Sequence, residues 1–182
     1  MSSVPKGKQK ESPFAARHHF YKLRDAVTGL MLNDFGFSQE KYERNIEKYR
    51  QAHQNSSGNV DEIVARWKKK NEAFNAWFID KECDAVLNIL RKIESEFTFG
   101  NSIYPSDTPA KISEYCERRK HINAAISYCY ILKQEIQYII KTLPVDMNKF
   151  DRFDDMITQQ IKLYKGVRRS DNRFLKQMKK NT

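Results

Sequence analysis

The histidine and cysteine side chains are the first candidates for chemistry in this sequence, and their spacing argues against metal binding. His18 and His19 are adjacent, so on a helix their side chains point about 100° apart and chelate one ion poorly. Cys83, Cys116 and Cys129 form no CxxC pair, and no histidine lies at ligand spacing from any of them. We therefore expect buried thiols, no metal and no cofactor.

Motifs for catalysis are equally absent. The sequence contains no nucleophile elbow, no glycine-rich phosphate loop and no HExxH pattern. Some helical ribonucleases carry an arginine with a histidine five residues later, and none of Arg17, Arg50, Arg118 and Arg119 has that partner. We expect a protein that is not an enzyme and has no small-molecule substrate.

The segment from residue 114 to residue 121 places charges across the start of an apolar helical stripe. Glu114 pairs with Arg118 at a spacing of four, and Glu117 pairs with His121. At least one of Arg118 and Arg119 must lie close to the apolar stripe. Two interpretations stay open: an ion-pair network on the helix surface, or a buried arginine that fixes helix register or meets an acidic partner.

The segment from residue 164 to residue 174 mixes arginines with Ser170, Asp171 and Asn172 after Gly166. An arginine guanidinium group donates two parallel hydrogen bonds to the oxygens of one phosphate, and an aromatic side chain stacks on a base. The alternative is a disordered, solubilising tail. The predicted nucleic-acid-binding residues of the chain are Arg118, Arg119, Lys165, Arg168, Arg169, Arg173, Phe174 and Lys176.

Net charge and composition indicate the kind of partner and the cellular location of the protein. The 182 residues carry a formal net charge of +10, which favours polyanionic partners. No run of 18 apolar residues spans a bilayer, and residues 1–10 lack the apolar core of a secretory signal. The sequence predicts a cytoplasmic protein with no membrane association.

Helical periodicity predicts the elements that must position these residues. Pro13 after Ser12 opens a first helix, Ser38 caps a second, Val60 begins a long third, Thr108 and Pro109 open a fourth, and Asp146 caps a last helix that ends near Gly166. Lys68-Lys69-Lys70 marks a possible bend in the third helix. We predict an all-α, antiparallel up-and-down bundle of four core helices plus an N-terminal helical extension. The predicted divisions are a flexible basic N-terminus (1–11), the extension (12–59), the bundle core (60–166) and a basic C-terminal tail (167–182).

The second half of the chain resembles a known family. The segments CERRKHINAAIS (residues 116–127) and KGVRRSDN (residues 165–172), in their helical setting, are similar to the accessory variability determinant proteins, over about residues 74–173. Those proteins accompany the reverse transcriptases of diversity-generating retroelements. Residues 1–60 have no counterpart in a minimal four-helix member.

The resemblance implies a four-helix bundle that forms a homo-oligomeric barrel with a basic surface. It implies binding to the reverse transcriptase and to its template RNA, which enables cDNA synthesis, and it implies no catalytic residue. The family's basic surface corresponds here to Arg118, Arg119, Arg168, Arg169 and Arg173.

Three functional interpretations follow from the residues and the resemblance together. The first is a non-enzymatic RNA-binding bundle, the accessory subunit of a retroelement reverse transcriptase. The second is a protein–protein scaffold that engages an acidic partner. The third, a helical DNA-binding protein, lacks a convincing helix-turn-helix pair in the sequence.

Overall fold

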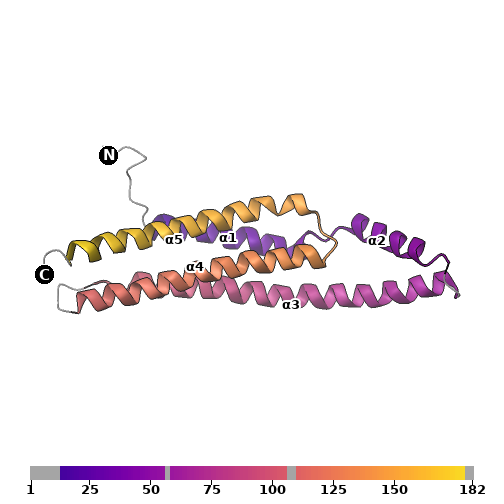
Figure 1. The fold of residues 1–182 in the computed structure, drawn as a ribbon, viewed down its shortest axis with the longest axis horizontal. Coiled ribbons are helices and arrows are strands. Elements are labelled where there is room, and N and C mark those ends of the chain that lie inside the picture. The colour runs from indigo at the N-terminus through magenta and orange to yellow at the C-terminus, as the bar shows by residue number, and fades with distance from the viewer. Residues whose placement is uncertain (1–12, 56–57, 106–109, 179–182) are drawn as a thin grey trace.

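The computed structural model describes residues 13–55, 58–105 and 110–178. Within these residues the chain is all helical and contains no strand (Figure 1). The helices are α1 (Pro13–Leu32), α2 (Gln39–Ala52), α3 (Val60–Ser102), α4 (Lys111–Thr142) and α5 (Asp151–Met178), with 3-10 turns at Asp34–Gly36 and Met147–Lys149. The predicted all-α class is confirmed.

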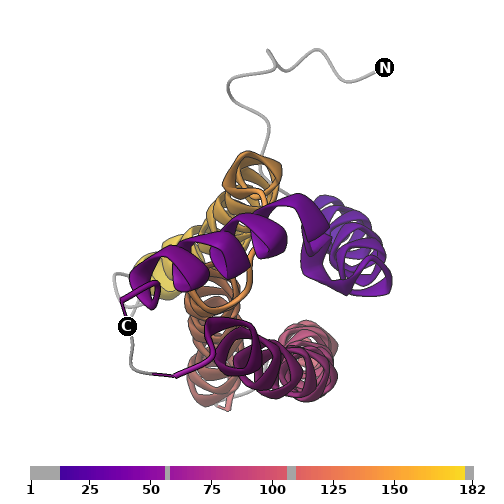
Figure 2. The ribbon, with the colours of Figure 1, turned by 90° about the vertical axis from the view of Figure 1, so that its right-hand side faces the viewer.

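The helices pack antiparallel as an elongated bundle. α3 packs against α4, α4 against α5, and α5 against α1. Figure 2 shows these helices end-on, with α2 in front of them. The N-terminal part of α3 extends past the end of α4, and α2 covers it (Figure 1). The bundle prediction is confirmed, and its fourth member is α1.

The core is built from one apolar stripe on each of the four bundle helices. Leu23, Leu90, Leu132 and Ile157, one from each of these helices, are buried in this core. Burying each such side chain stabilises the fold by roughly 1.5–3 kcal/mol before conformational entropy is counted. Polar contacts add specificity where α1 meets α5. The buried Gln160 donates from Nε2 to the backbone oxygen of Ala16 at 3.1 Å, and its Oε1 accepts from His19 Nδ1 at 2.7 Å.

Gly100 lets α3 and α4 approach closely. A Cβ atom at this position would lie 3.1 Å from the backbone oxygen of Arg118 and 3.1 Å from the Cβ of His121. Both atoms belong to the helical framework of α4, so they cannot move aside cheaply.

We expect Gly100→Val to lower the free energy of unfolding by about 1–3 kcal/mol, because the added methyl groups overpack this contact. Urea denaturation followed by circular dichroism measures the change. Gly29→Val on α1 is the matched control, since a Cβ there has no heavy atom within 4 Å. Equal costs at the two glycines would contradict the explanation.

One predicted helix end is wrong. α5 does not end near Gly166 but continues to Met178. α5 continues past Gly166 because its stripe of buried side chains extends to Val167 and Asp171. A helical glycine costs about 1 kcal/mol relative to alanine, and tertiary packing outweighs it. Residues 167–178 are therefore part of a helix, not a tail.

Other boundaries agree with the sequence. α1 begins at Pro13, and Ser38 caps α2 by accepting a hydrogen bond from the Lys41 backbone nitrogen. α3 is a single helix that runs through residues 68–70 without interruption. The predicted signals at Ser12, Thr108 and Pro109 lie outside the described residues.

Candidate nucleic-acid interface

Arg118 is buried and serves the fold. Its Nε donates to Asp171 Oδ2 on α5 at 3.0 Å, and its Nη1 donates to the backbone oxygens of Gly100 and Ile103 at 3.2 Å each. Only 8 % of Arg118 is exposed. Of the two interpretations left open by the sequence, the geometry matches a buried arginine that ties α3, α4 and α5 together. The partner that buries Arg118 is Asp171 on α5, and we remove Arg118 from the candidate interface.

The neighbouring arginine, Arg119, faces outward into a groove between the start of α4 and the end of α5. This groove has a volume of about 580 Å³, and Ile112 and Leu175 form apolar parts of its wall. Its cations are Arg119, Arg169, Arg173 and Lys176. Four of the predicted nucleic-acid-binding residues therefore converge here.

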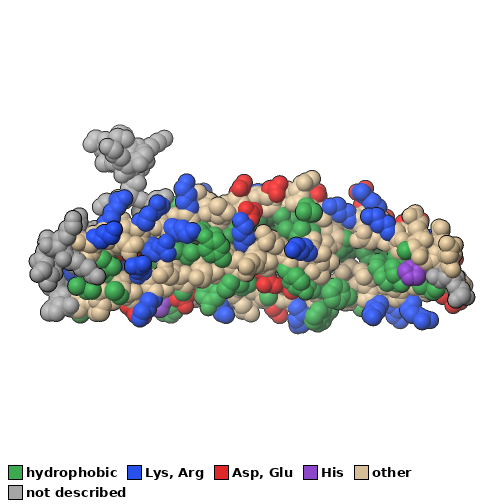
Figure 3. Space-filling model, in the orientation of Figure 1, with side chains coloured by type: hydrophobic (Ala, Val, Ile, Leu, Met, Phe, Trp, Pro, Cys, Tyr) green, Lys and Arg blue, Asp and Glu red, His purple; other side chains and the backbone are tan. Residues whose placement is uncertain are grey.

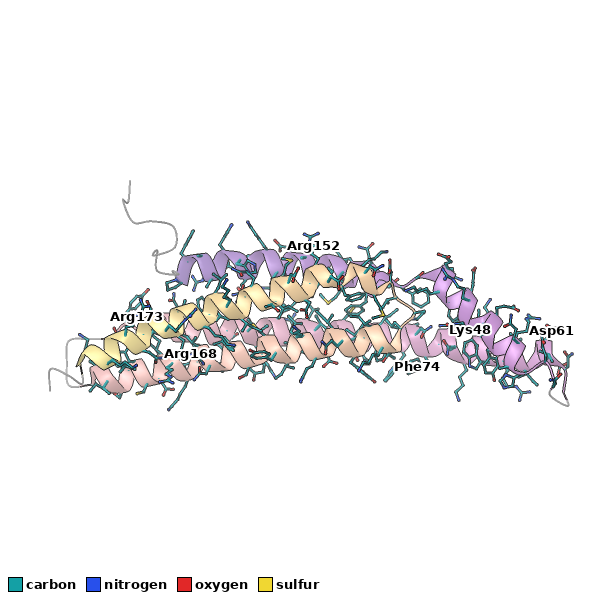
Figure 4. The ribbon with its side chains drawn as sticks, turned by 45° about the horizontal axis from the view of Figure 1, so that its top comes forward. Lys48, Asp61, Phe74, Arg152, Arg168 and Arg173 are labelled. Carbon is teal, nitrogen blue, oxygen red and sulfur yellow. The ribbon has the colours of Figure 1, made fainter. Side chains whose placement is uncertain are left out.

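A second groove, also about 580 Å³, follows along the same two helices and shares Arg169 with the first. Tyr130 forms its wall on α4. Its cations are Lys133, Lys162, Lys165, Arg168 and Arg169. Arg168 lies at the seam of the two helices, where its Nη1 donates to Asn123 Oδ1 at 2.9 Å (Figure 4).

The charged side chains that line the two grooves are all positive. The residues that line the two grooves include eight Lys or Arg side chains and no carboxylate. Figure 3 shows Lys and Arg gathering over the C-terminal half of α5, whereas acidic side chains gather over its N-terminal end. Lys133 of the second groove forms an ion pair with Asp154 at 2.7 Å. We call these two adjoining grooves the α4–α5 groove.

Lys133, Lys162 and Tyr130 also line this groove, although they are not among the residues predicted from the sequence. The signal for Lys162 is its helical spacing from Lys165 and Arg169, which is visible once α5 is known to continue past Gly166. Lys133 and Tyr130 lie on α4, and only the packing of α4 against α5 brings them to the groove. Phe174 belongs to α5, but its side chain lies outside the described part of the chain.

Two of the three cysteines, Cys83 and Cys129, lie outside the two grooves. Burial raises the pKa of Cys129 to about 12, as expected for a buried thiol, and burial also raises the pKa of Cys83. Cys116 is exposed at the first groove, contrary to the expectation of a buried residue. Across the described ranges, no three His, Cys, Asp or Glu side chains converge to hold a metal ion.

Comparisons with protein-family models, with curated proteins and with solved structures find no match to this chain. The part of the chain that the structure describes contains no helix long and apolar enough to cross a membrane. The fold and the groove together define the class of this protein. It is an antiparallel helical bundle with a groove lined by basic side chains between α4 and α5.

Proposed function

We propose that this protein binds nucleic acid, with RNA as the leading candidate, along the α4–α5 groove, and that it acts by binding rather than by catalysis. The observation that carries the proposal is the lining of the groove by eight cations and no carboxylate. Such a surface attracts phosphate along its whole length, whereas a protein surface evolved only for solubility mixes both signs of charge.

Contacts to phosphate make binding sensitive to salt, because each contact releases condensed counterions. The log of the binding constant falls with the log of salt concentration by roughly 0.7–0.9 per neutralised phosphate. Five contacts along α5 correspond to a slope of about −4 by that rule. Affinity that is equal at low and moderate salt would contradict the proposal.

We expect Arg169→Glu with Arg173→Glu to weaken RNA binding by about 100-fold or more at low salt. The change removes two charge-assisted contacts, each of about 1.5 kcal/mol or more, and adds repulsion. Fluorescence anisotropy of a labelled RNA oligonucleotide, titrated at several salt concentrations, measures both the affinity and the slope.

The control for this experiment changes the same charge elsewhere. Lys69→Glu with Lys70→Glu alters two exposed residues of α3 outside the groove. We expect a small loss that reflects net charge alone. A loss as large as that of the groove variant would mean that binding follows net charge and not the groove. Charge reversal is a better probe than deletion of residues 165–182, because that deletion removes the buried Val167 and Asp171.

The family resemblance extends the proposal to specific partners. It adds a reverse transcriptase, its template RNA and a homo-oligomer of this chain, and these three rest on the resemblance alone. Light scattering coupled to size exclusion, with the absorbance ratio at 260 and 280 nm, measures the oligomer mass and any bound nucleic acid. A nucleic-acid-free monomer would remove the basis for the oligomeric accessory subunit.

A second candidate function, a scaffold for an acidic protein, is favoured by a different observation. Trp77 on α3 and Tyr138 on α4 are more than half exposed, and Phe74 lies beside Trp77 with ring centroids 6.0 Å apart. Exposed aromatic clusters of this kind mark interaction surfaces. Partner binding that survives charge reversal in the α4–α5 groove but fails on Trp77→Ala would support this candidate.

A further inference from the structure

The cations of α5 lie in a single line. Lys162, Lys165, Arg169, Arg173 and Lys176 follow one another at intervals of three or four residues, so they share one face of the helix. Fourteen residues of helix span about 21 Å. Neighbouring positions in such a row have Cβ atoms about 5–6 Å apart. The five side chains therefore form a straight row along which the phosphates of one nucleic-acid strand can lie.

The facing helix does not supply a second line of free cations. Lys133 pairs with Asp154 at 2.7 Å. Among the described residues, Arg119 is then the cation that α4 contributes to the groove without an ion pair to an acidic side chain. A duplex presents two phosphate lines separated by grooves of about 6–12 Å, and a single row of cations contacts one of them at a time. The single row on α5 matches one strand.

Tyr130 adds a surface for a base. Its ring lines the groove and is 46 % exposed, and Lys165 Nζ donates to its hydroxyl at 2.8 Å. The same ammonium lies 5.4 Å from the ring centroid, so the ring is fixed next to a phosphate-binding charge. An aromatic ring beside such a charge is the arrangement that stacks an unpaired base. Bases within a duplex are already stacked and cannot use it.

From this juxtaposition, and resting on the proposed function, we infer that the α4–α5 groove binds single-stranded nucleic acid, with the phosphates along the cation row of α5 and a base stacked on Tyr130. The apolar walls at Ile112 and Leu175 give further contact area for bases or sugars near the other end of the row. Ribose and deoxyribose strands share the phosphate and base chemistry on which this inference depends, so the test includes both.

The experiment uses the full chain and three labelled probes of one 15-nucleotide sequence: the RNA strand, the DNA strand, and the RNA annealed to its complement. We expect each single strand to bind about tenfold or more tightly than the duplex at equal salt. A tighter RNA strand than DNA strand identifies RNA as the ligand, and the reverse order identifies DNA.

Substitutions of Tyr130 test the stacking contact. Tyr130→Leu removes the ring and should weaken single-strand binding by about 5- to 150-fold, the range for one base–aromatic stack, while duplex binding and the salt slope stay the same. Tyr130→Phe keeps the ring and should retain the affinity. Tyr138→Leu, at an exposed tyrosine on the same helix outside the groove, is the matched control and should have no effect.

The possible failures are distinguishable. If the duplex binds as tightly as the single strands, or if Tyr130→Leu binds as the parent does, the inference is overturned, and the proposed function stands as long as charge reversal at Arg169 and Arg173 weakens binding. If no probe binds the parent protein at low salt, both the inference and the proposed function are overturned.

Discussion

Arg118→Met is expected to destabilise the protein by about 3–5 kcal/mol, the largest effect of any single substitution considered. The change leaves Asp171 as a buried carboxylate without its partner, and it removes the donor to two backbone oxygens of the α3 end. Burial already raises the pKa of Asp171, and Arg118 opposes that rise. For a chain of this length the loss corresponds to a fall of about 6–20 °C in the thermal midpoint.

Neighbouring and paired variants separate the ion pair from general damage to the helix. Arg119→Met changes the next, exposed arginine and should leave the thermal midpoint within about 2 °C. The double variant Arg118→Met with Asp171→Leu should recover much of the stability, because two apolar side chains of suitable size often replace a buried pair without loss. If Arg118→Met and Arg119→Met have equal midpoints, Arg118 does not connect α3, α4 and α5 as the structure indicates. Reduced RNA binding by Arg118→Met would follow from instability, since its side chain does not reach the groove.

The helices were predictable from the sequence because their signals are local. Pro13, the Ser38 cap and the apolar repeat that begins at Val60 each act within a few residues, and the structure begins helices at these places. The error at Gly166 has a physical origin of longer range. A glycine followed by arginines predicts a helix end locally, but Val167 and Asp171 are buried against other helices, and that burial continues α5.

The candidate site was only partly predictable for the same reason. The cluster of cations near the C-terminus is evident in the sequence, and six of the eight predicted residues line the α4–α5 groove: Arg119, Lys165, Arg168, Arg169, Arg173 and Lys176. The sequence does not distinguish Arg118 from Arg119, which differ by one position and by 100° on the helix, until the partner Asp171 is located 53 residues away. Tyr130 carries no local signal, because only the tertiary packing places it beside Lys165.

A buried carboxyl group makes stability depend on pH. Glu82 on α3 is only 8 % exposed, and its Oε2 has no hydrogen-bond partner within the described structure. Burial first, and then the carboxyl of Glu135 on α4, raise the pKa of Glu82 from 4.5 to about 7. The folded protein therefore binds a proton at this site up to about pH 7, whereas the unfolded chain releases it near pH 4.5. Stability from this group is complete below pH 4.5 and is lost as the pH rises to 7 and above.

Glu82→Gln is accordingly expected to stabilise the protein at pH 8 by on the order of 2–3 kcal/mol, and to change its stability little near pH 4.5. The amide keeps the shape of the protonated carboxyl and stays neutral at every pH, so the variant no longer loses a proton from the α3–α4 interface. Urea denaturation at half-unit steps between pH 4.5 and pH 8.5 measures the difference, with Glu43→Gln on the exposed face of α2 as the control. A constant difference between variant and parent across this range would show that Glu82 has the same pKa in the folded and unfolded states. A difference that grows between pH 5 and pH 7 would show that the folded protein holds the proton on Glu82 to a higher pH than the unfolded chain does.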